Sequence, residues 1–251
     1  MKFIHISDLH FHSRKADNKK EFELLDFINQ KYSTHHLIVT GDITDDGHER
    51  QYKQAFAALK PFKNRIFICP GNHDFGALGN FYSRERAERF DRLLSIPLEQ
   101  GGTFTGDSTP VVNIVKERND QVMLIALDTN LETDHTFDCA CGEVGDKQLA
   151  VLDNILSNPT SSEFVKILFF HHHPFMHGNA FMELIDARKL MRIIYSKVEV
   201  LLFGHKHASS CWESNNGIEH ILASDNSPGK KYAREIVITK KAIKVNDVKI
   251  E

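Results

Sequence analysis

The sequence predicts an α/β fold, and three observations lead to that prediction. Short runs rich in β-branched and aromatic residues recur along the chain, and amphipathic segments with helical spacing lie between several of them. The chain has 251 residues, which is enough to bury most of its apolar surface in one domain. Strands that alternate with helices are typical of a parallel sheet covered by helices, so we expect residues 1–251 to form a single α/β domain.

The predicted strands are continuous apolar runs of strand length, as expected for strands that are buried on both faces. They occupy residues 2–7, 37–40, 65–69, 121–127, 165–170 and 198–203. None approaches the roughly 18 apolar residues of a membrane-spanning helix, so we expect no membrane partner. The N-terminus lacks a signal-peptide core of about 7–15 apolar residues, which indicates a cytoplasmic protein.

The predicted helices have apolar residues three and four positions apart on one face. Phe22, Leu25 and Ile28 form such a face in the first helix, and Asp45 or Asp46 is expected to cap the second. The helices occupy residues 18–32, 48–62, 145–157 and 182–196.

Two regions break the alternation. The tail has three apolar segments with no helix between them, at residues 218–223, 234–240 and 242–250, which predicts C-terminal strands in an antiparallel edge or a second sheet. Residues 75–110 form the longest irregular region and hold a charged helix at 81–94. Loops of this length in a compact domain are usually functional, so residues 75–110 are a candidate substrate-side insertion.

Composition excludes several classes of protein. The chain carries 31 Lys+Arg against 34 Asp+Glu, so its net charge of −3 gives no electrostatic support for nucleic acid as a partner. With 41% hydrophobic residues the chain is not disordered. The four cysteines have no C-x-x-C spacing, and we expect thiols; the alternative is that Cys139 and Cys141 form half of a metal site. They are Cys69, Cys139, Cys141 and Cys211. No feature indicates an oligomeric state.

The fifteen histidines are the unusual feature of the composition, because histidine is the common metal ligand among side chains. Many of them follow predicted strands together with other ligand-type residues. The carboxyl ends of parallel strands meet at one edge of a sheet, so these strand ends should converge into one metal site. The five segments are Asp8-Leu9-His10, Gly41-Asp42, Gly71-Asn72-His73-Asp74, His171-His172-His173 and Gly204-His205-Lys206-His207.

The number of donors predicts two metal ions. Seven candidates are too many for one four-coordinate zinc, but they suit two ions that share a carboxylate. Imidazole and carboxylate ligands with one amide oxygen favour Mn, Fe or Zn. The candidates are Asp8, His10, Asp42, Asn72, one of His171 to His173, His205 and His207. His12, His171, His173 and His177 lie beside the site without an assigned role, and His5, His35, His36, His48, His135 and His220 are expected to be structural or surface residues.

Such a site predicts phosphoester hydrolysis. Two ions roughly 3.5–4 Å apart hold phosphate oxygens and lower the pKa of a shared water towards about 7, so that the resulting hydroxide attacks phosphorus in line. His73 is not needed as a ligand and is available to protonate the leaving alkoxide. Asp74 is expected to orient the ring of His73; the alternative is that Asp74 caps the next segment.

These five segments, in this order, resemble the calcineurin-like metallophosphoesterase superfamily. The resemblance implies a four-layer αββα sandwich with two central mixed sheets, and substrate phosphate in contact with Asn72 and His73. It implies one ion on Asp8, His10, Asp42 and His207. The other ion is implied on Asp42, Asn72, His172 and His205, with Asp42 bridging and His171 inward or structural.

Within the superfamily, residues 41–47 and the His-His-Pro at 172–174 are most similar to the cyclic-nucleotide phosphodiesterase branch. Two departures are His171, a third histidine, and Phe175, which replaces a second proline. The favoured function is therefore metal-dependent hydrolysis of small phosphodiesters, with cyclic nucleotides among the candidate substrates. The alternatives are a phosphomonoesterase or protein phosphatase, a nuclease, and a metal-binding scaffold without catalysis.

Overall fold

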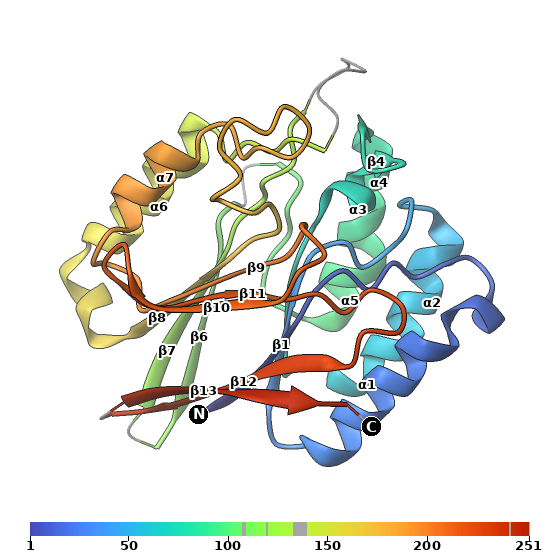
Figure 1. The fold of residues 1–251 in the computed structure, drawn as a ribbon, viewed down its shortest axis with the longest axis horizontal. Coiled ribbons are helices and arrows are strands. Elements are labelled where there is room, and N and C mark those ends of the chain that lie inside the picture. Colours follow the sequence, from blue (N-terminus) through green and yellow to red (C-terminus); the bar gives the residue numbers. More distant parts are fainter. Residues whose placement is uncertain (107–108, 119, 133–139, 241, 251) are drawn as a thin grey trace.

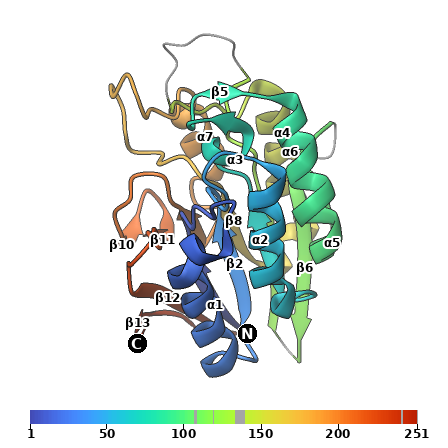
Figure 2. The same ribbon diagram turned by 90° about the vertical axis from the view of Figure 1, so that its right-hand side faces the viewer.

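The computed structural model describes residues 1–251 except 107–108, 119, 133–139, 241 and 251. Two mixed β-sheets pack face to face, and helices cover the outer face of each (Figure 1). Figure 2 shows α1 and α2 on one side of this stack, with α6 and α7 behind the other sheet. The molecule therefore has the four αββα layers that the resemblance implied.

The first sheet has the strand order β13-β12-β1-β2-β3. β1, β2 and β3 are parallel, while β12 runs antiparallel to both β1 and β13. The helix α1 connects β1 to β2, and α2 connects β2 to β3, as sequence periodicity predicted. The bounds are β1 (Lys2–Ile6), α1 (Lys19–Lys31), β2 (His36–Thr40), α2 (Glu49–Leu59), β3 (Ile66–Cys69), β12 (Tyr232–Thr239) and β13 (Ala242–Lys249).

The second sheet has the order β10-β11-β9-β8-β7-β6. Its four central strands are parallel, and the edge strands β6 and β10 are antiparallel to their neighbours. The helices α6 and α7 cover its outer face (Figure 1). The bounds are β6 (Val111–Glu117), β7 (Asp120–Ala126), α6 (Asp146–Ser157), β8 (Val165–Phe169), α7 (Ala187–Ile194), β9 (Val200–Phe203), β10 (Ser210–Asn215) and β11 (Ile218–Ala223).

The region predicted as irregular is a series of short elements that begins directly after β3. A two-stranded hairpin, β4-β5, leads into helical turns that pack beside α2. Its elements are α3 (Asn72–Phe75), β4 (Gly76–Ala77), β5 (Phe81–Tyr82), α4 (Arg84–Phe90), a π-helical turn (Asp91–Ser95) and α5 (Ile96–Leu98). Short 3₁₀ turns occupy Lys15–Asn18, Lys60–Phe62 and Pro159–Glu163.

Four expectations need correction. β6 and β10 were not predicted; β10 is mostly polar, and β6 has valine and isoleucine residues but is only partly buried. In the tail, β12 and β13 form the expected antiparallel edge, but β11 joins the other sheet parallel to β9. α7 begins at Ala187, not near residue 182, since Asp186 is its N-cap residue. His48, not Asp45 or Asp46, is the N-cap residue of α2, and its N–H donates to Gln51 Oε1.

The burial of the central strands explains why they could be predicted from the sequence. β3 and β9 are buried at every position, so their sequences are continuous apolar runs. One apolar cluster fills the space between the sheets and under α1 and α2, and another lies under α6 and α7. In the described ranges, no helix combines the length and apolarity that crossing a membrane requires.

Candidate metal centre

Backbone hydrogen bonds join the loop after β1 to the loop after β2, and the loop after β8 to the loop after β9. Asp8 N donates to Gly41 O, His10 N donates to Asp42 O, and Gly204 N donates to His171 O. Gly204 is needed for the close approach, because a Cβ there would collide with Ser7 Oγ and Asp8 Oδ2. The predicted convergence of strand ends is therefore built by direct contact of the loops.

Several predicted ligands have a backbone conformation that side chains rarely adopt. Asp8, His10 and Asp42 have φ of 59°, 51° and 48°, and His205 and His207 have φ of 74° and 51°. A left-handed non-glycine residue is uncommon, and such strain gathers at functional sites where the surrounding structure imposes it. Here the strain turns the side chains that follow β1, β2 and β9 toward a common point.

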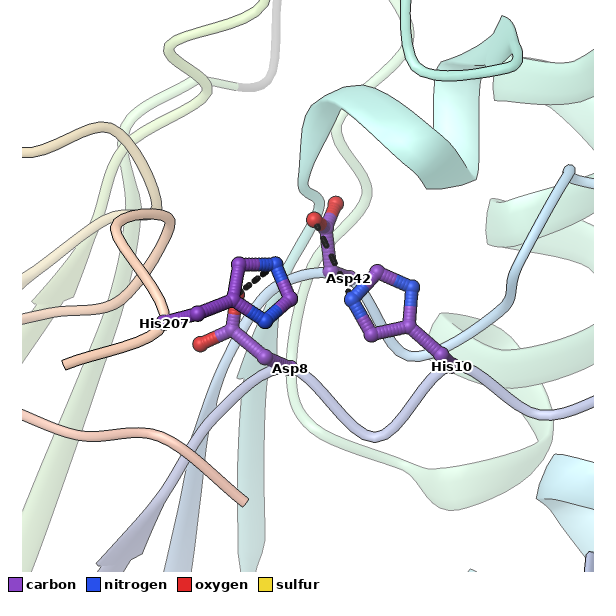
Figure 3. Close-up of side chains that lie close together, drawn as sticks. All are labelled: Asp8, His10, Asp42 and His207. Atoms are coloured by element: carbon purple, nitrogen blue, oxygen red, sulfur yellow. Dashed lines mark ion pairs between the residues drawn. The ribbon is translucent and has the colours of Figure 1, made fainter. Parts of the chain in front are cut away.

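Asp8, His10, Asp42 and His207 form a first group of donors (Figure 3). One ligand atom from each lies within 4.8 Å of those of the others. His10 Nε2 is 3.8 Å from Asp42 Oδ2, and His207 Nε2 is 3.9 Å from Asp8 Oδ1. We refer to these four residues as the first donor group.

The first donor group fits a metal ion. Asp8 Oδ2 and His10 Nε2 are buried without a hydrogen-bond partner. A buried polar atom of this kind costs free energy unless a ligand satisfies it. Burial lowers the pKa of His10 to about 4, which keeps its imidazole in the neutral form that binds metals.

A second group of donors surrounds the ring of His171. His171 Nε2 lies 3.2 Å from Asp42 Oδ2, 3.0 Å from Asn72 Oδ1 and 3.2 Å from His205 Nδ1. The other ring nitrogen, His171 Nδ1, is hydrogen-bonded to Thr40 O at 2.8 Å, which fixes the orientation of the ring. We refer to Asp42, Asn72, His171 and His205 as the second donor group. It shares Asp42 Oδ2 with the first.

The resemblance selected His172, whose ring lies next to the second donor group. His172 Nδ1 is 2.8 Å from Thr129 Oγ1, and its ring packs against Gly142. The ring also lies 4.5 Å from that of His205, and His172 Nε2 is buried without a partner. His171 is thus the histidine whose Nε2 contacts Asp42 and Asn72, while His172 Nε2 is a buried nitrogen without a partner beside His205, so the assignment of His172 as a ligand stays a prediction.

The charges of the site are coupled. Burial opposes ionisation of Asp42, yet His171 and His73 hold its pKa well below the usual value. Burial also opposes protonation of His171, but the carboxylates of Asp42 and Asp8 raise its pKa to about 9. The His171 proton thus stands where three donor atoms meet, and a bound cation would replace it, since metal binding to a ligand releases its proton.

Metal loading is expected to raise the melting temperature. An ion that binds only the folded chain stabilises it by about 2.7 kcal/mol at 100 times its Kd, which corresponds to roughly 5–10 °C for a chain of this size. Differential scanning calorimetry with EDTA or Mn²⁺ measures the shift, with Asp8→Asn as the control in which the shift shrinks. An unchanged midpoint of the wild type in millimolar Mn²⁺ would count against a metal site.

His73 lies at the edge of the donor groups without joining them. Its backbone N–H donates to Asp42 Oδ1 at 2.9 Å, and its Nδ1 is 2.8 Å from Asp45 O. The carbonyl can only accept, so Nδ1 carries the proton toward Asp45 O and leaves Nε2 as the other reactive nitrogen. The ring stands edge-on to His10, with centroids 4.8 Å apart.

Asp74 does not hold the ring of His73, contrary to the expectation. Its buried carboxylate accepts hydrogen bonds from the N–H groups of Ile43, Thr44 and Gly71. Thr44 Oγ1 donates to it as well, at 2.8 Å. Burial and the neighbouring Asp42 raise the pKa of Asp74 to about 6. Asp74 therefore ties the loop after β2 to the loop after β3, and its contact with Gly71 caps α3, the helical turn that contains Asp74, not the next segment. The ring of His73 is held by the backbone carbonyl of Asp45, which sequence reasoning assigned only as a helix cap.

The other histidines lie either near the edge of the site or away from it. His12 Nδ1 lies 3.3 Å from Asp45 Oδ2 at the edge of the site, and His177 lies 3.8 Å from Glu183. His173 packs against Phe175, Phe203 and Trp212. The histidines expected to be structural have partners away from the donors: His5 with Thr40, His35 with Glu235, His36 with Glu117, His48 with Asp46 and His220 with Ile243. His135 lies outside the described residues.

The predicted cysteine pair is only partly described. Cys69 and Cys211 are thiols. Cys141 Sγ lies 3.4 Å from Ala180 O. Cys139 lies outside the described residues, so both interpretations of this pair stay predictions.

Comparison with known proteins places the chain among phosphoesterases. The sequence profile of the calcineurin-like phosphoesterases matches residues 1–209. A probable cyclic nucleotide phosphodiesterase of Coxiella burnetii is 24% identical over 251 residues, which cover 96% of this chain and 90% of the relative. A 3′,5′-cyclic adenosine monophosphate phosphodiesterase of Vibrio vulnificus is 24% identical over 220 residues, 82% of this chain and 70% of the relative.

The fold has solved counterparts. A dimetal phosphatase from Danio rerio superposes with a TM-score of 0.69 at 13% sequence identity, over 98% of this chain and 95% of that one. At this identity the likeness concerns the fold alone. The match confirms the architecture, while the argument for the chemistry depends on the donor groups.

Proposed function

The chain belongs to the calcineurin-like phosphoesterase family and is thus a metal-dependent hydrolase of phosphoric esters, and we propose that its substrates are small phosphodiesters, with cyclic nucleotides first among them. The names of the two relatives support the diester over the monoester. The net charge of −3 supports a small substrate over a nucleic acid.

One observation carries the proposal: Asp42 Oδ2 belongs to both donor groups. It lies 3.8 Å from His10 Nε2 in the first and 3.2 Å from His171 Nε2 in the second. A carboxylate placed between two sets of imidazole and oxygen donors is suited to bridge two ions. We propose that the first donor group holds one ion and the second donor group the other, with His171 in the place that the resemblance gave to His172.

The two ions, of Mn, Fe or Zn, would neutralise phosphate charge and activate a water for in-line attack on phosphorus. The chain's own residues set the geometry. Asn72 and His73 lie side by side at the start of α3, where both are placed to contact a phosphate. His73 is proposed to donate its Nε2 proton to the leaving oxygen, because Asp45 O occupies its Nδ1 proton.

His73→Ala is expected to lower kcat by about 100-fold or more while both ions remain bound, because a general acid contributes roughly 10²–10⁴-fold and His73 belongs to neither donor group. Steady-state kinetics and metal analysis on the same preparation test this expectation. The matched control is His177→Ala, an exposed histidine outside the donor groups. If the His73 variant lost its metal in proportion to its activity, the proposed acid role would be wrong.

A pocket next to the site supports a small organic substrate. Its volume is about 500 Å³, and Phe75, Tyr82 and Phe104 line it together with Asp128 and Asn130. A smaller pocket lined by Asn72 and Gly79 shares Tyr82 and Asn130 with it, so the larger pocket lies on the Asn72 side of the metal centre. Ligand pockets usually have 300–1,000 Å³, which accommodates a nucleoside. The proposal that residues 75–110 form the substrate side of the molecule depends on the residues of this region that line the larger pocket.

The function is tested by a substrate panel with Mn²⁺-loaded protein. It compares bis-p-nitrophenyl phosphate with p-nitrophenyl phosphate, and 3′,5′- with 2′,3′-cyclic nucleotides. The proposal predicts a higher kcat/KM for the diester than for the monoester, and turnover of at least one cyclic nucleotide. A preference for the monoester would overturn the assignment to phosphodiesters, and degradation of single-stranded DNA at low salt would indicate a nuclease.

A further inference from the structure

The hairpin at residues 76–82 contacts the two residues proposed to bind phosphate. β4 and β5 pair through Gly76 with Tyr82 and Ala77 with Phe81. The tip is fixed from outside, because Leu78 N donates to Asp46 Oδ1 at 2.9 Å. Figure 1 shows the hairpin at the upper end of α3, which begins with Asn72. The loop after β2 therefore holds the tip of the hairpin over the loop after β3.

The hairpin determines which way the Asn72 amide points. Asn72 Nδ2 donates to Gly79 O at 3.0 Å. Asn72 Oδ1 lies on the opposite side of the amide, 3.0 Å from both His171 Nε2 and His205 Nδ1. A rotated amide would turn its N–H donors toward the other donors and remove an oxygen from the second donor group. The carbonyl of Gly79 thus selects the orientation that a metal ligand requires.

Only glycine fits at position 79. Its φ is +72°, and a Cβ there would lie 2.6 Å from Asn72 Nδ2 and 2.7 Å from His73 Nε2. Both contacts are far shorter than van der Waals contact, so a larger residue must displace the amide, the imidazole or the hairpin. The smallest change at this position therefore acts on both phosphate-binding residues together.

We propose that the hairpin at residues 76–82, anchored by Asp46, is a positioning element in which Gly79 orients the Asn72 amide toward the second ion and sets the place of the His73 ring. The inference rests on the proposed function, since it assigns Asn72 to the second donor group. Nothing in the hairpin touches a metal ion or reacts; it acts through Asn72 and His73.

Gly79→Ala tests the proposal against a matched control. Gly178 has φ of +75° and open space where its Cβ would be, so Gly178→Ala carries the same backbone strain without a collision. Titration calorimetry of the metal-free variants with Mn²⁺ counts the bound ions, and bis-p-nitrophenyl phosphate gives kcat and KM. We expect Gly79→Ala to bind the second Mn²⁺ about 10–100-fold more weakly and to lose kcat by a similar factor, as for outer partners of metal ligands. Gly178→Ala should keep both ions and its kcat.

A second pair of variants releases the hairpin without a collision and serves if Gly79→Ala does not fold. Asp46→Ala removes the acceptor of the Leu78 N–H, whereas Asp46→Asn retains an oxygen there. We expect weaker binding of the second Mn²⁺ in Asp46→Ala and near wild-type binding in Asp46→Asn. Wild-type Mn²⁺ affinity and kcat in both Gly79→Ala and Asp46→Ala would overturn the inference.

Asn72→Ala separates this inference from the proposed function. If Asn72→Ala binds two Mn²⁺ ions as tightly as the wild type, Asn72 is not a ligand, and both the second donor group and the inference are wrong. If Asn72→Ala loses the second ion while Gly79→Ala retains it, the metal site stands and only the role of the hairpin is overturned.

Discussion

Asp42→Asn is expected to lower the affinity for metal and to reduce kcat/KM by more than about 100-fold, since even outer partners of a metal ligand change affinity or activity by roughly 10–100-fold. Asp42 Oδ2 lies 3.8 Å from His10 Nε2 and 3.2 Å from His171 Nε2. The asparagine keeps the shape of the side chain but removes its charge. In one of its two orientations it also turns N–H donors toward the histidines.

The substitution is designed to spare the fold. Asp42 Oδ1 accepts the His73 N–H, and the amide oxygen of asparagine can accept it in the same way. Metal analysis, kinetics and the unfolding midpoint of metal-free protein are measured together. Asp153→Asn is the control, because this aspartate lies exposed on α6, where its contacts with Lys197 and Ser157 are at the surface. Two tightly bound ions and full turnover in Asp42→Asn would show that Asp42 does not bridge.

The central strands could be predicted from the sequence because burial on both faces leaves an unbroken apolar run. β10 could not, because an edge strand is stabilised by its neighbour's backbone and its mostly exposed side chains follow no apolar pattern; β6 was missed although four of its seven residues are valine or isoleucine. The parallel pairing of β11 with β9 was likewise hidden, since pairing depends on the path of the chain between them. Local pattern thus predicts which segments are strands better than it predicts their neighbours.

The sequence also predicted that the candidate ligands lie close together. Asp8, Asp42 and Asn72 each follow a parallel strand, and parallel strands end at one edge. The finer contacts were not predictable, because they depend on side-chain directions. Asp74 follows His73 in a single helical turn, so its carboxylate points to Thr44 while the His73 ring reaches Asp45 O. Two residues that are adjacent in the sequence therefore form hydrogen bonds with different partners.

The two glycines at strand ends also show that contacts between distant segments cannot be predicted from local sequence. Gly41 and Gly204 both precede a ligand-type residue, where glycine allows the backbone to turn sharply off a strand. Gly41 does have a φ of +82°. At Gly204 the reason is the side chain of Ser7 from the other sheet, which occupies the space of a Cβ. A contact between distant segments leaves no mark in the sequence around either one.

The paired variants His171→Ala and His172→Ala give the sharpest test of the second donor group. His171→Ala removes a nitrogen that lies within 3.2 Å of Asp42 Oδ2, Asn72 Oδ1 and His205 Nδ1. We expect it to abolish high-affinity binding of the second Mn²⁺ and to lower kcat by more than about 100-fold, because a ligand should matter more than its outer partners. Titration calorimetry with Mn²⁺ and steady-state kinetics measure both effects.

His172→Ala is the matched neighbour, since both histidines are fully buried in the same loop. Its ring is held by Thr129 and lies against that of His205, so its removal should shift His205 and cost less than about 10-fold in kcat, below the range for losing a ligand. Both variants leave a cavity of one imidazole, but the metal-free unfolding midpoint should fall further in His171→Ala, because that variant also leaves the buried carboxylate of Asp42 without its charged partner. The assignment reverses if His172→Ala loses the second ion and His171→Ala retains it, because His172 Nε2 is then the nitrogen that binds the ion.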